Sequence, residues 1–128
     1  MELAKCCHDL DLISWFTDDD CESVTSYGSL DYFTAKNAPE GSADRCLDCK
    51  FADTCVYSAK KIYITDRAEK GNLQRPCDIV VNDPTVEKLY RALKTSKYGK
   101  CVYKCDNNVV DHQVVNIKFK NNSTAHLR

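Results

Sequence analysis

The chain has 128 residues, and its 18 Lys and Arg residues against 19 Asp and Glu residues leave a formal charge of −1. The charged fraction of 29% and the hydrophobic fraction of 43% are typical of a soluble globular domain. This balance gives no electrostatic reason to expect nucleic acid or an anionic membrane as a partner. No apolar run approaches the roughly 18 residues that a membrane span requires.

The first predicted element is a helix over residues 3–16, because apolar residues recur there at spacings of three to four. Three aspartates, Asp18 to Asp20, end it. A strand is predicted over residues 23–33, and a loop over residues 34–45, where proline and glycine break any period.

Residues 46–66 carry three cysteines and then the stretch VYSAKKIYI, for which the sequence leaves helix and strand open. A second helix is predicted to start at Asp83-Pro84-Thr85, with Asp83 as its cap, and to stop before Gly99. The last thirty residues predict a β-hairpin that turns at residues 121–123. The order of elements favours an α+β fold over a regularly alternating βαβ fold.

Cysteine and glycine are the two informative counts. Nine cysteines are an odd number, and the start of the chain, MELAKCCHDLD, has acidic residues where an export signal would be hydrophobic. We therefore expect a cytoplasmic chain with reduced thiols, some of which hold metal. The four glycines lie too far apart for a GxGxxG or GxxxxGK loop, so the chain has no glycine-rich site for a nucleotide.

The first helix carries a candidate acid–base pair. His8 and Asp11 are three residues apart and share one helix face, with Lys5 three residues before His8. A histidine beside a carboxylate can move a proton at neutral pH. The alternative is a surface histidine that an acid accompanies by chance.

A candidate metal site lies in the loop RCLDCKFADTCVY. Cys46 and Cys49 have the Cys-x2-Cys spacing with which two thiolates chelate one tetrahedral ion, and Cys55 supplies a third ligand. The fourth ligand is left open among Cys101, Cys105 and His112, and we prefer Cys105 because the polar turn Asp106-Asn107 follows it. Thiolates select zinc or an iron–sulfur cluster, and the expected metal is a structural zinc. Reduced thiols without metal, or a local disulfide, are the alternatives.

A third group of polar residues precedes the last predicted strand. Asp106, Asn107, Asp111 and His112 follow Cys101 and Cys105 in the string GKCVYKCDNNVVDHQVV. Such a group marks either the edge of a cleft or a solvated turn, and the sequence does not decide between them.

Three strings, LAKCCHDLDLISW, RCLDC…DTCVYSAKKIY and YGKCVYKCDNNVVDHQVVNIKF, resemble successive landmarks of the Gfo/Idh/MocA family of NAD(P)-dependent oxidoreductases. The resemblance follows a cysteine-containing branch and covers nearly the whole chain. It implies that residues 1–128 are part of a C-terminal substrate and dimerisation domain, with an open, mainly antiparallel sheet and helices on one face. The family's Rossmann domain, which holds NAD or NADP, is expected upstream as a partner of this chain.

The resemblance also implies roles on the first helix. The family's histidine gives or takes a proton at the substrate carbinol, and His8 matches that position. Asp11 matches the aspartate three residues later and, with Lys5, is expected in the wall of the substrate pocket. The family's earlier aspartate is Ala4 in this chain, so the usual Asp–His pair is incomplete.

Two functional hypotheses follow from these observations. The first is the substrate-binding and dimerisation part of a dehydrogenase that acts on a sugar, polyol or related carbinol; the chain alone is expected to be inactive. The second is a stand-alone, metal-stabilised module that binds a protein partner. We also expect a homo-oligomer, because Val114, Ile117 and Phe119 would leave an apolar patch on the outer face of the sheet.

Overall fold

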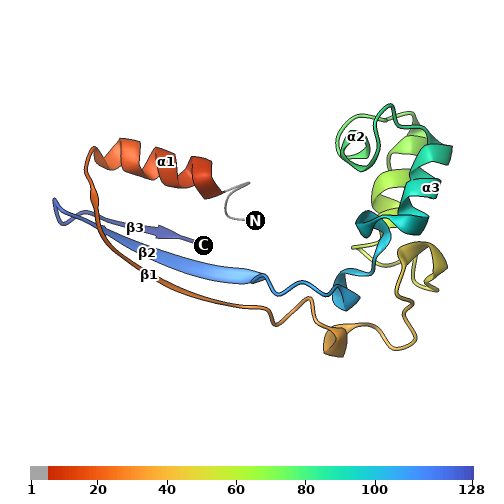
Figure 1. Ribbon diagram of the computed structural model, residues 1–128, viewed down its shortest axis with the longest axis horizontal. Helices are drawn as coiled ribbons and strands as arrows, with labels where there is room; N and C mark the ends of the chain where they lie inside the picture. The colour runs from red at the N-terminus through yellow and green to blue at the C-terminus, as the bar shows by residue number, and fades with distance from the viewer. Residues whose placement is uncertain (1–5) are drawn as a thin grey trace. The chain divides into compact units, whose positions relative to one another are not determined.

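The computed structural model describes residues 6–128 and divides into two compact units (Figure 1). Residues 6–31 and 107–128 form the first unit, and residues 32–106 form the second. The second unit is therefore an insertion between the first two strands of the first. None of the described helices has both the length and the apolar character that a membrane span requires.

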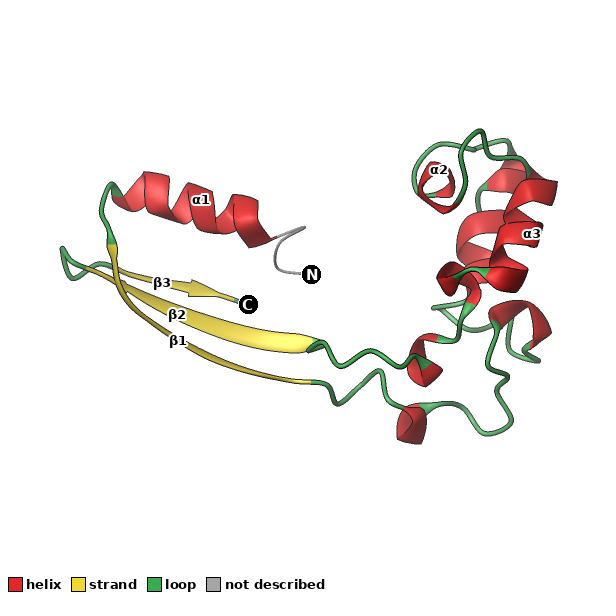
Figure 2. Ribbon diagram, viewed as in Figure 1, coloured by secondary structure: helices red, strands yellow, loops and turns green. Residues whose placement is uncertain are grey.

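The first unit is a helix beside a three-stranded antiparallel sheet (Figure 2). Helix α1 covers Cys6–Thr17, and the strands are β1 at Cys21–Ser29, β2 at His112–Phe119 and β3 at Thr124–Leu127. Their order in the sheet is β1-β2-β3, so the central strand β2 pairs both with β1, which is distant in the sequence, and with β3, which follows it directly. The predicted α+β class with an open antiparallel sheet is confirmed, and the described strands form no parallel Rossmann sheet.

The predicted hairpin at the end of the chain is confirmed. Strands β2 and β3 pair with Lys118 opposite Thr124. Asn122 takes a left-handed φ of 66°, which asparagine tolerates better than most residues. The Asn121 side chain accepts a hydrogen bond from the Ser123 backbone N–H at 2.9 Å, which closes the turn locally.

The apolar residues of β2 that were expected on the outer face of the sheet lie mainly on its covered face. Ile117 and Phe119 are two residues apart on β2, share one face, and are both buried. That face is the one beside α1, since Ile117 lines a groove together with Leu10 of the helix. The opposite face carries the polar residues Asn116 and Lys118, together with the half-buried Val114 and the exposed Tyr27. The prediction that Ile117 and Phe119 are exposed is wrong, because the helix covers the side of the sheet toward which both point.

The predicted strand over residues 23–33 ends earlier, at Ser29. Tyr32 and Phe33 belong to the second unit instead, where they pack with Tyr57 and Tyr103. The ring centroids in this aromatic cluster lie 5.0–6.2 Å apart, which is the usual range for tilted and edge-to-face pairs. Packing in the second unit therefore overrides the strand preference of these two aromatic residues.

The second unit is built from short helices. Its two α-helices are α2 at Cys77–Val80 and α3 at Val86–Thr95, and a π-helix covers Lys60–Thr65. The 3₁₀-helices cover Ala35–Asn37, Cys46–Asp48, Ala68–Lys70, Lys97–Gly99 and Val102–Lys104. The stretch VYSAKKIYI, which the sequence left open, is thus mainly helical.

The N-cap of helix α3 lies two residues later than predicted. Thr85 is its N-cap, and its side-chain oxygen accepts a hydrogen bond from the Lys88 backbone N–H at 3.2 Å. Asp83 has a left-handed φ of 48° and lies outside the helix. The predicted aspartate cap is wrong: the left-handed backbone of Asp83 is not the extended conformation of an N-cap, whereas Thr85 has that conformation, with φ −131° and ψ 161°.

The core of the second unit gathers around α3. Leu89 and Leu93 are fully buried and lie four residues apart on one side of the helix. Further buried members of this core are Cys46, Ala59, Ile64, Ala68 and Cys77. Cys46 joins the cysteine loop to this core, so the loop is anchored at its first cysteine.

Candidate functional site

The predicted acid–base residues lie on the exposed side of α1. His8 and Asp11 are both exposed, and Lys5 lies outside the described residues. Cys6, Asp9 and Leu10 of the helix line the groove beside the sheet. The structure thus places His8 on α1 as predicted. The side of the helix that lines the groove carries Asp9 and Leu10, and His8 is not among the lining residues.

The groove between α1 and the sheet is a candidate small-molecule site in the first unit. It has a volume of about 410 Å³, which is within the usual range of ligand sites. Its apolar lining comes from Val24, Val115, Ile117 and Leu127, and its polar lining from Asp9, Ser26, Gln113 and Arg128.

Gln113 and Ser26 are positioned by the pairing of β1 and β2. Ser26 lies opposite Val115, and Gln113 lies opposite Gly28, so both side chains are on the face toward α1. The Gln113 amide nitrogen donates to the Ser26 hydroxyl oxygen at 2.7 Å. Sequence reasoning missed these residues, because only the strand register shows that they line a groove with Asp9 of the helix.

The cysteine loop brings four cysteines to one small cavity in the second unit. Three of them are Cys46, Cys49 and Cys55, the cysteines that the sequence analysis proposed as metal ligands, and the fourth is Cys101. Cys105 does not line this cavity; its thiol donates to the carbonyl oxygen of Cys101 at 3.3 Å. The cysteine that completes the cavity lining is thus Cys101, four positions before Cys105, which the sequence analysis preferred as the fourth ligand.

An antiparallel bridge explains why Cys101 reaches the loop. Arg45 pairs with Lys100, and the Cys101 backbone N–H donates to the Asp44 carbonyl oxygen at 2.8 Å. This bridge sets Cys101 beside Cys46, whose burial raises its thiol pKa, with further raising from the neighbouring thiols. His112, the third alternative in the sequence, belongs to the first unit.

All nine cysteines are free thiols. Among residues 6–128, no three His, Cys, Asp or Glu side chains form a group arranged to hold a metal ion in the conformation that the structure shows. The cysteines at the cavity are neighbours around one space, and their sulfur atoms are not assembled as a coordination shell.

The aromatic cluster borders the same cavity through Tyr57 and Tyr103. The Tyr103 hydroxyl donates to the Tyr32 hydroxyl oxygen at 3.5 Å. This contact holds the pKa of Tyr103 well above its usual range and, with a hydrogen bond from Tyr57, lowers the pKa of Tyr32. The cluster closes the cavity on one side with ring surfaces.

A third constellation lies where β1 ends and β2 begins. Ser29 and His112 are directly opposite each other, and the His112 Nε2 atom lies 2.9 Å from the Ser29 hydroxyl oxygen. His112 Nδ1 lies 2.9 Å from the Asp111 carboxylate, and the Ser29 hydroxyl donates to the Asp31 carboxylate at 2.7 Å. The sequence left a cleft edge and a solvated turn open here; the structure has a hydrogen-bonded cluster at a strand end, in which the His112 side chain is 62% exposed and the Asp111 side chain 6% exposed.

Comparison with models of known protein families, with curated proteins and with solved structures found no match to this chain.

Proposed function

We propose that this chain is the substrate-binding part of a nicotinamide-dependent oxidoreductase that acts on a carbinol of a sugar, polyol or related compound. The sequence resemblance described above supports this proposal. The structural observation that carries it is the groove between α1 and the sheet, where polar groups surround an apolar lining. That combination suits a small molecule with several hydroxyl groups, because the polar groups orient it and the apolar lining excludes water.

Three groups on the groove differ in hydrogen-bonding character, which is what a polyol requires. The Asp9 carboxylate accepts hydrogen bonds, the Gln113 amide both donates and accepts, and the Arg128 guanidinium donates. In the proposal, these groups fix the orientation of the substrate. His8, next to Asp9 on the same helix turn, holds or supplies the proton of a carbinol oxygen that extends past the groove edge.

The residues present do not fit a dinucleotide. Gly28 lies inside β1, Gly41 and Gly71 occupy separate turns of the second unit, and none of them opens a helix. In the proposal, a separate Rossmann domain would hold NAD or NADP, which would supply the hydride chemistry, and the residues of this chain bind and orient the substrate and handle its proton.

The proposal includes association with a second copy, in the cytoplasm. Trp15 and Phe16 are adjacent on α1 and remain 72% and 74% exposed, and Tyr27 on β1 remains 76% exposed. Large exposed aromatic side chains mark interaction surfaces. Sedimentation velocity over a range of concentrations tests this association: Trp15→Ser should weaken it, and a chain that stays monomeric at high concentration contradicts it.

The experiment for substrate binding is an NMR titration of the ¹⁵N-labelled chain with a panel of sugars, polyols and sugar acids. We expect at least one compound to shift the amide signals of groove residues, and Gln113→Ala to weaken that binding. Asn116→Ala is the matched control, because Asn116 lies on the same strand but on the opposite face of the sheet. No shift with any compound, or equal loss in both variants, contradicts the proposal.

Two further measurements separate the parts of the proposal. Calorimetric titration with NADH and NADPH should give no binding, and micromolar affinity for either would overturn the assignment of the cofactor to another domain. His8→Ala should leave substrate affinity nearly unchanged while lowering turnover about 10²–10⁴-fold once a cofactor domain is fused to the chain. Unchanged turnover would show that His8 is a surface residue without a role in catalysis.

A further inference from the structure

We propose that Cys46, Cys49, Cys55 and Cys101 form a binding site for one zinc ion that orders the cysteine loop of the second unit. This inference is independent of the proposed oxidoreductase function, because the site lies wholly within residues 32–106. It differs from the sequence prediction in its fourth ligand, which is Cys101 in place of Cys105.

The spacing and the placement of the four cysteines carry the proposal together. Cys46 and Cys49 have the spacing of a chelating pair, and Cys55 follows in the same loop. Cys101 comes from 46 residues beyond Cys55 in the sequence, yet the bridge between Arg45 and Lys100 brings it to the same cavity. Convergence of a distant cysteine on a Cys-x2-Cys loop is the arrangement of a closed structural zinc site.

The size of the cavity matches an occupant of atomic dimensions. Its volume is about 20 Å³. A cavity needs roughly 10–15 Å³ to hold one water molecule. A substrate does not fit, whereas a single ion does. The sulfur atoms do not yet form a metal-holding group, so zinc binding requires the cysteine side chains to turn toward the cavity about their Cα–Cβ bonds.

One polar group at the cavity suits sulfur atoms that carry negative charge. The Ser42 hydroxyl is buried in the cavity lining and has no hydrogen-bond partner among the described residues. Second-shell donors of this kind stabilise metal-bound thiolates, and an inward thiolate would give the Ser42 hydroxyl an acceptor.

The local sequence explains why such a loop needs an ion. Residues 46–58 contain short turns and one 3₁₀-helix, and no strand or α-helix crosses them. Ordering each loop residue costs about 1–2 kcal/mol of conformational free energy. The binding of a structural zinc ion contributes on the order of 10 kcal/mol to folding, which is comparable to the cost of ordering several such residues. As zinc binds, each of the four thiols releases its proton to solvent. With four thiolates bound, no coordination position remains open, so the ion is structural and performs no chemistry.

The test is the metal content of the full chain, expressed with zinc and purified without chelator but with a non-thiol reductant. We expect about one zinc per chain by elemental analysis, and loss of most of that zinc in Cys49→Ser and Cys101→Ser. Cys105→Ser is the matched control: it lies four residues from Cys101, has similar exposure, and does not line the cavity. It should retain the metal.

A second measurement remains decisive where a cysteine variant fails to fold. The wild-type chain, stripped of zinc and titrated with Co²⁺, should develop the thiolate-to-cobalt charge-transfer and visible bands of a tetrahedral tetrathiolate site. A wild-type chain without zinc and without these cobalt bands overturns the proposal, and so does equal zinc loss in Cys105→Ser and Cys101→Ser. A water-filled cavity or a disulfide would give the first of these outcomes.

Discussion

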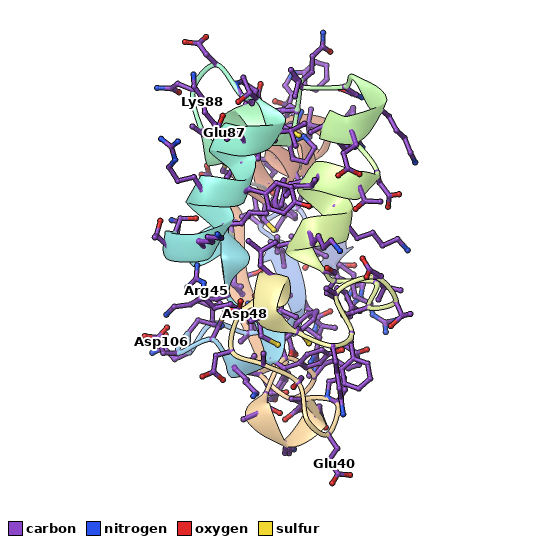
Figure 3. All side chains as sticks on the ribbon, turned by 90° about the vertical axis from the view of Figure 1, so that its right-hand side faces the viewer. Glu40, Arg45, Asp48, Glu87, Lys88 and Asp106 are labelled. Carbon is purple, nitrogen blue, oxygen red and sulfur yellow. The ribbon has the colours of Figure 1, made fainter. Side chains whose placement is uncertain are left out.

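The guanidinium of Arg45 donates a hydrogen bond to the backbone carbonyl of Leu93 at 2.8 Å, and a second one to the carbonyl of Ser96 at 2.6 Å. Figure 3 shows Arg45 at the C-terminal end of α3, away from Glu87 and Lys88 in its first turn. The last carbonyl groups of a helix have no partner within the helix. Arg45 therefore caps α3 with a residue from the start of the cysteine loop.

Removal of this cap should destabilise the second unit. Arg45→Ala leaves two carbonyl groups at the end of α3 without their charged donor, and we expect the free energy of unfolding to fall by about 2–3 kcal/mol. The control is Arg91→Ala, whose guanidinium pairs with Glu87 on the exposed side of α3 at 3.0 Å and should cost about 0.5 kcal/mol or less. Urea unfolding measures both, and similar losses would contradict the capping role.

Gly99 should tolerate no side chain, although its φ is not left-handed. A Cβ at this position would overlap the carbonyl oxygen of Leu93, the same group that Arg45 binds. Gly99→Ala should therefore cost about 3 kcal/mol or more, at the upper end of over-packing effects. Gly71 has a φ of +79° and open space around its Cα, so Gly71→Ala should cost only about 1 kcal/mol. Thermal or urea unfolding that reverses this order contradicts the prediction.

The second unit should lose stability at alkaline pH. Burial raises the pKa of the Tyr63 hydroxyl and of the Cys77 thiol above their usual values of 10.0 and 9.0. Both groups are acids that the folded state holds in their neutral form, so their stabilisation is complete below the unfolded-state pKa and is lost as pH rises toward the folded-state pKa. We expect the urea midpoint, measured in reductant, to fall between about pH 9 and pH 11.

Matched tyrosine variants test the cause of this alkaline loss. Tyr63→Phe should flatten the fall, because it removes a hydroxyl that must ionise in a partly buried place. Tyr27→Phe should leave the pH profile unchanged, since the Tyr27 side chain is exposed on β1. A flat profile in the wild-type chain, or equal flattening in both variants, would show that burial of Tyr63 is not the source.

His112 should hold the ends of β1 and β2 together. His112→Ala removes the contacts to Ser29 and Asp111, and we expect a loss of about 0.5–1 kcal/mol, since the site is exposed. Hydrogen exchange should accelerate at the Asp111 amide, which donates to the Ser29 carbonyl at 3.0 Å. His126→Ala is the control, because His126 contacts Asn116 elsewhere on the sheet and should leave the Asp111 amide protected.

Local patterns in the sequence were sufficient for the first helix and for the hairpin at the end of the chain. The apolar spacing predicted α1, which covers Cys6–Thr17, and the turn residues near Asn122 predicted the hairpin of β2 and β3. These predictions succeed because helix periodicity and turn preference depend on residues close together in the chain. The Cys-x2-Cys pair and Cys55 were recognisable for the same reason.

Tertiary structure alone decided the contacts between distant residues. The choice of Cys101 over Cys105 at the cavity depends on the bridge between Arg45 and Lys100, and the groove depends on α1 lying over β1 and β2. The burial of Ile117 and Phe119 follows from the side of the sheet that the helix covers. Alternation along a strand defines two faces but does not say which one is covered, and that choice is made by packing across the fold.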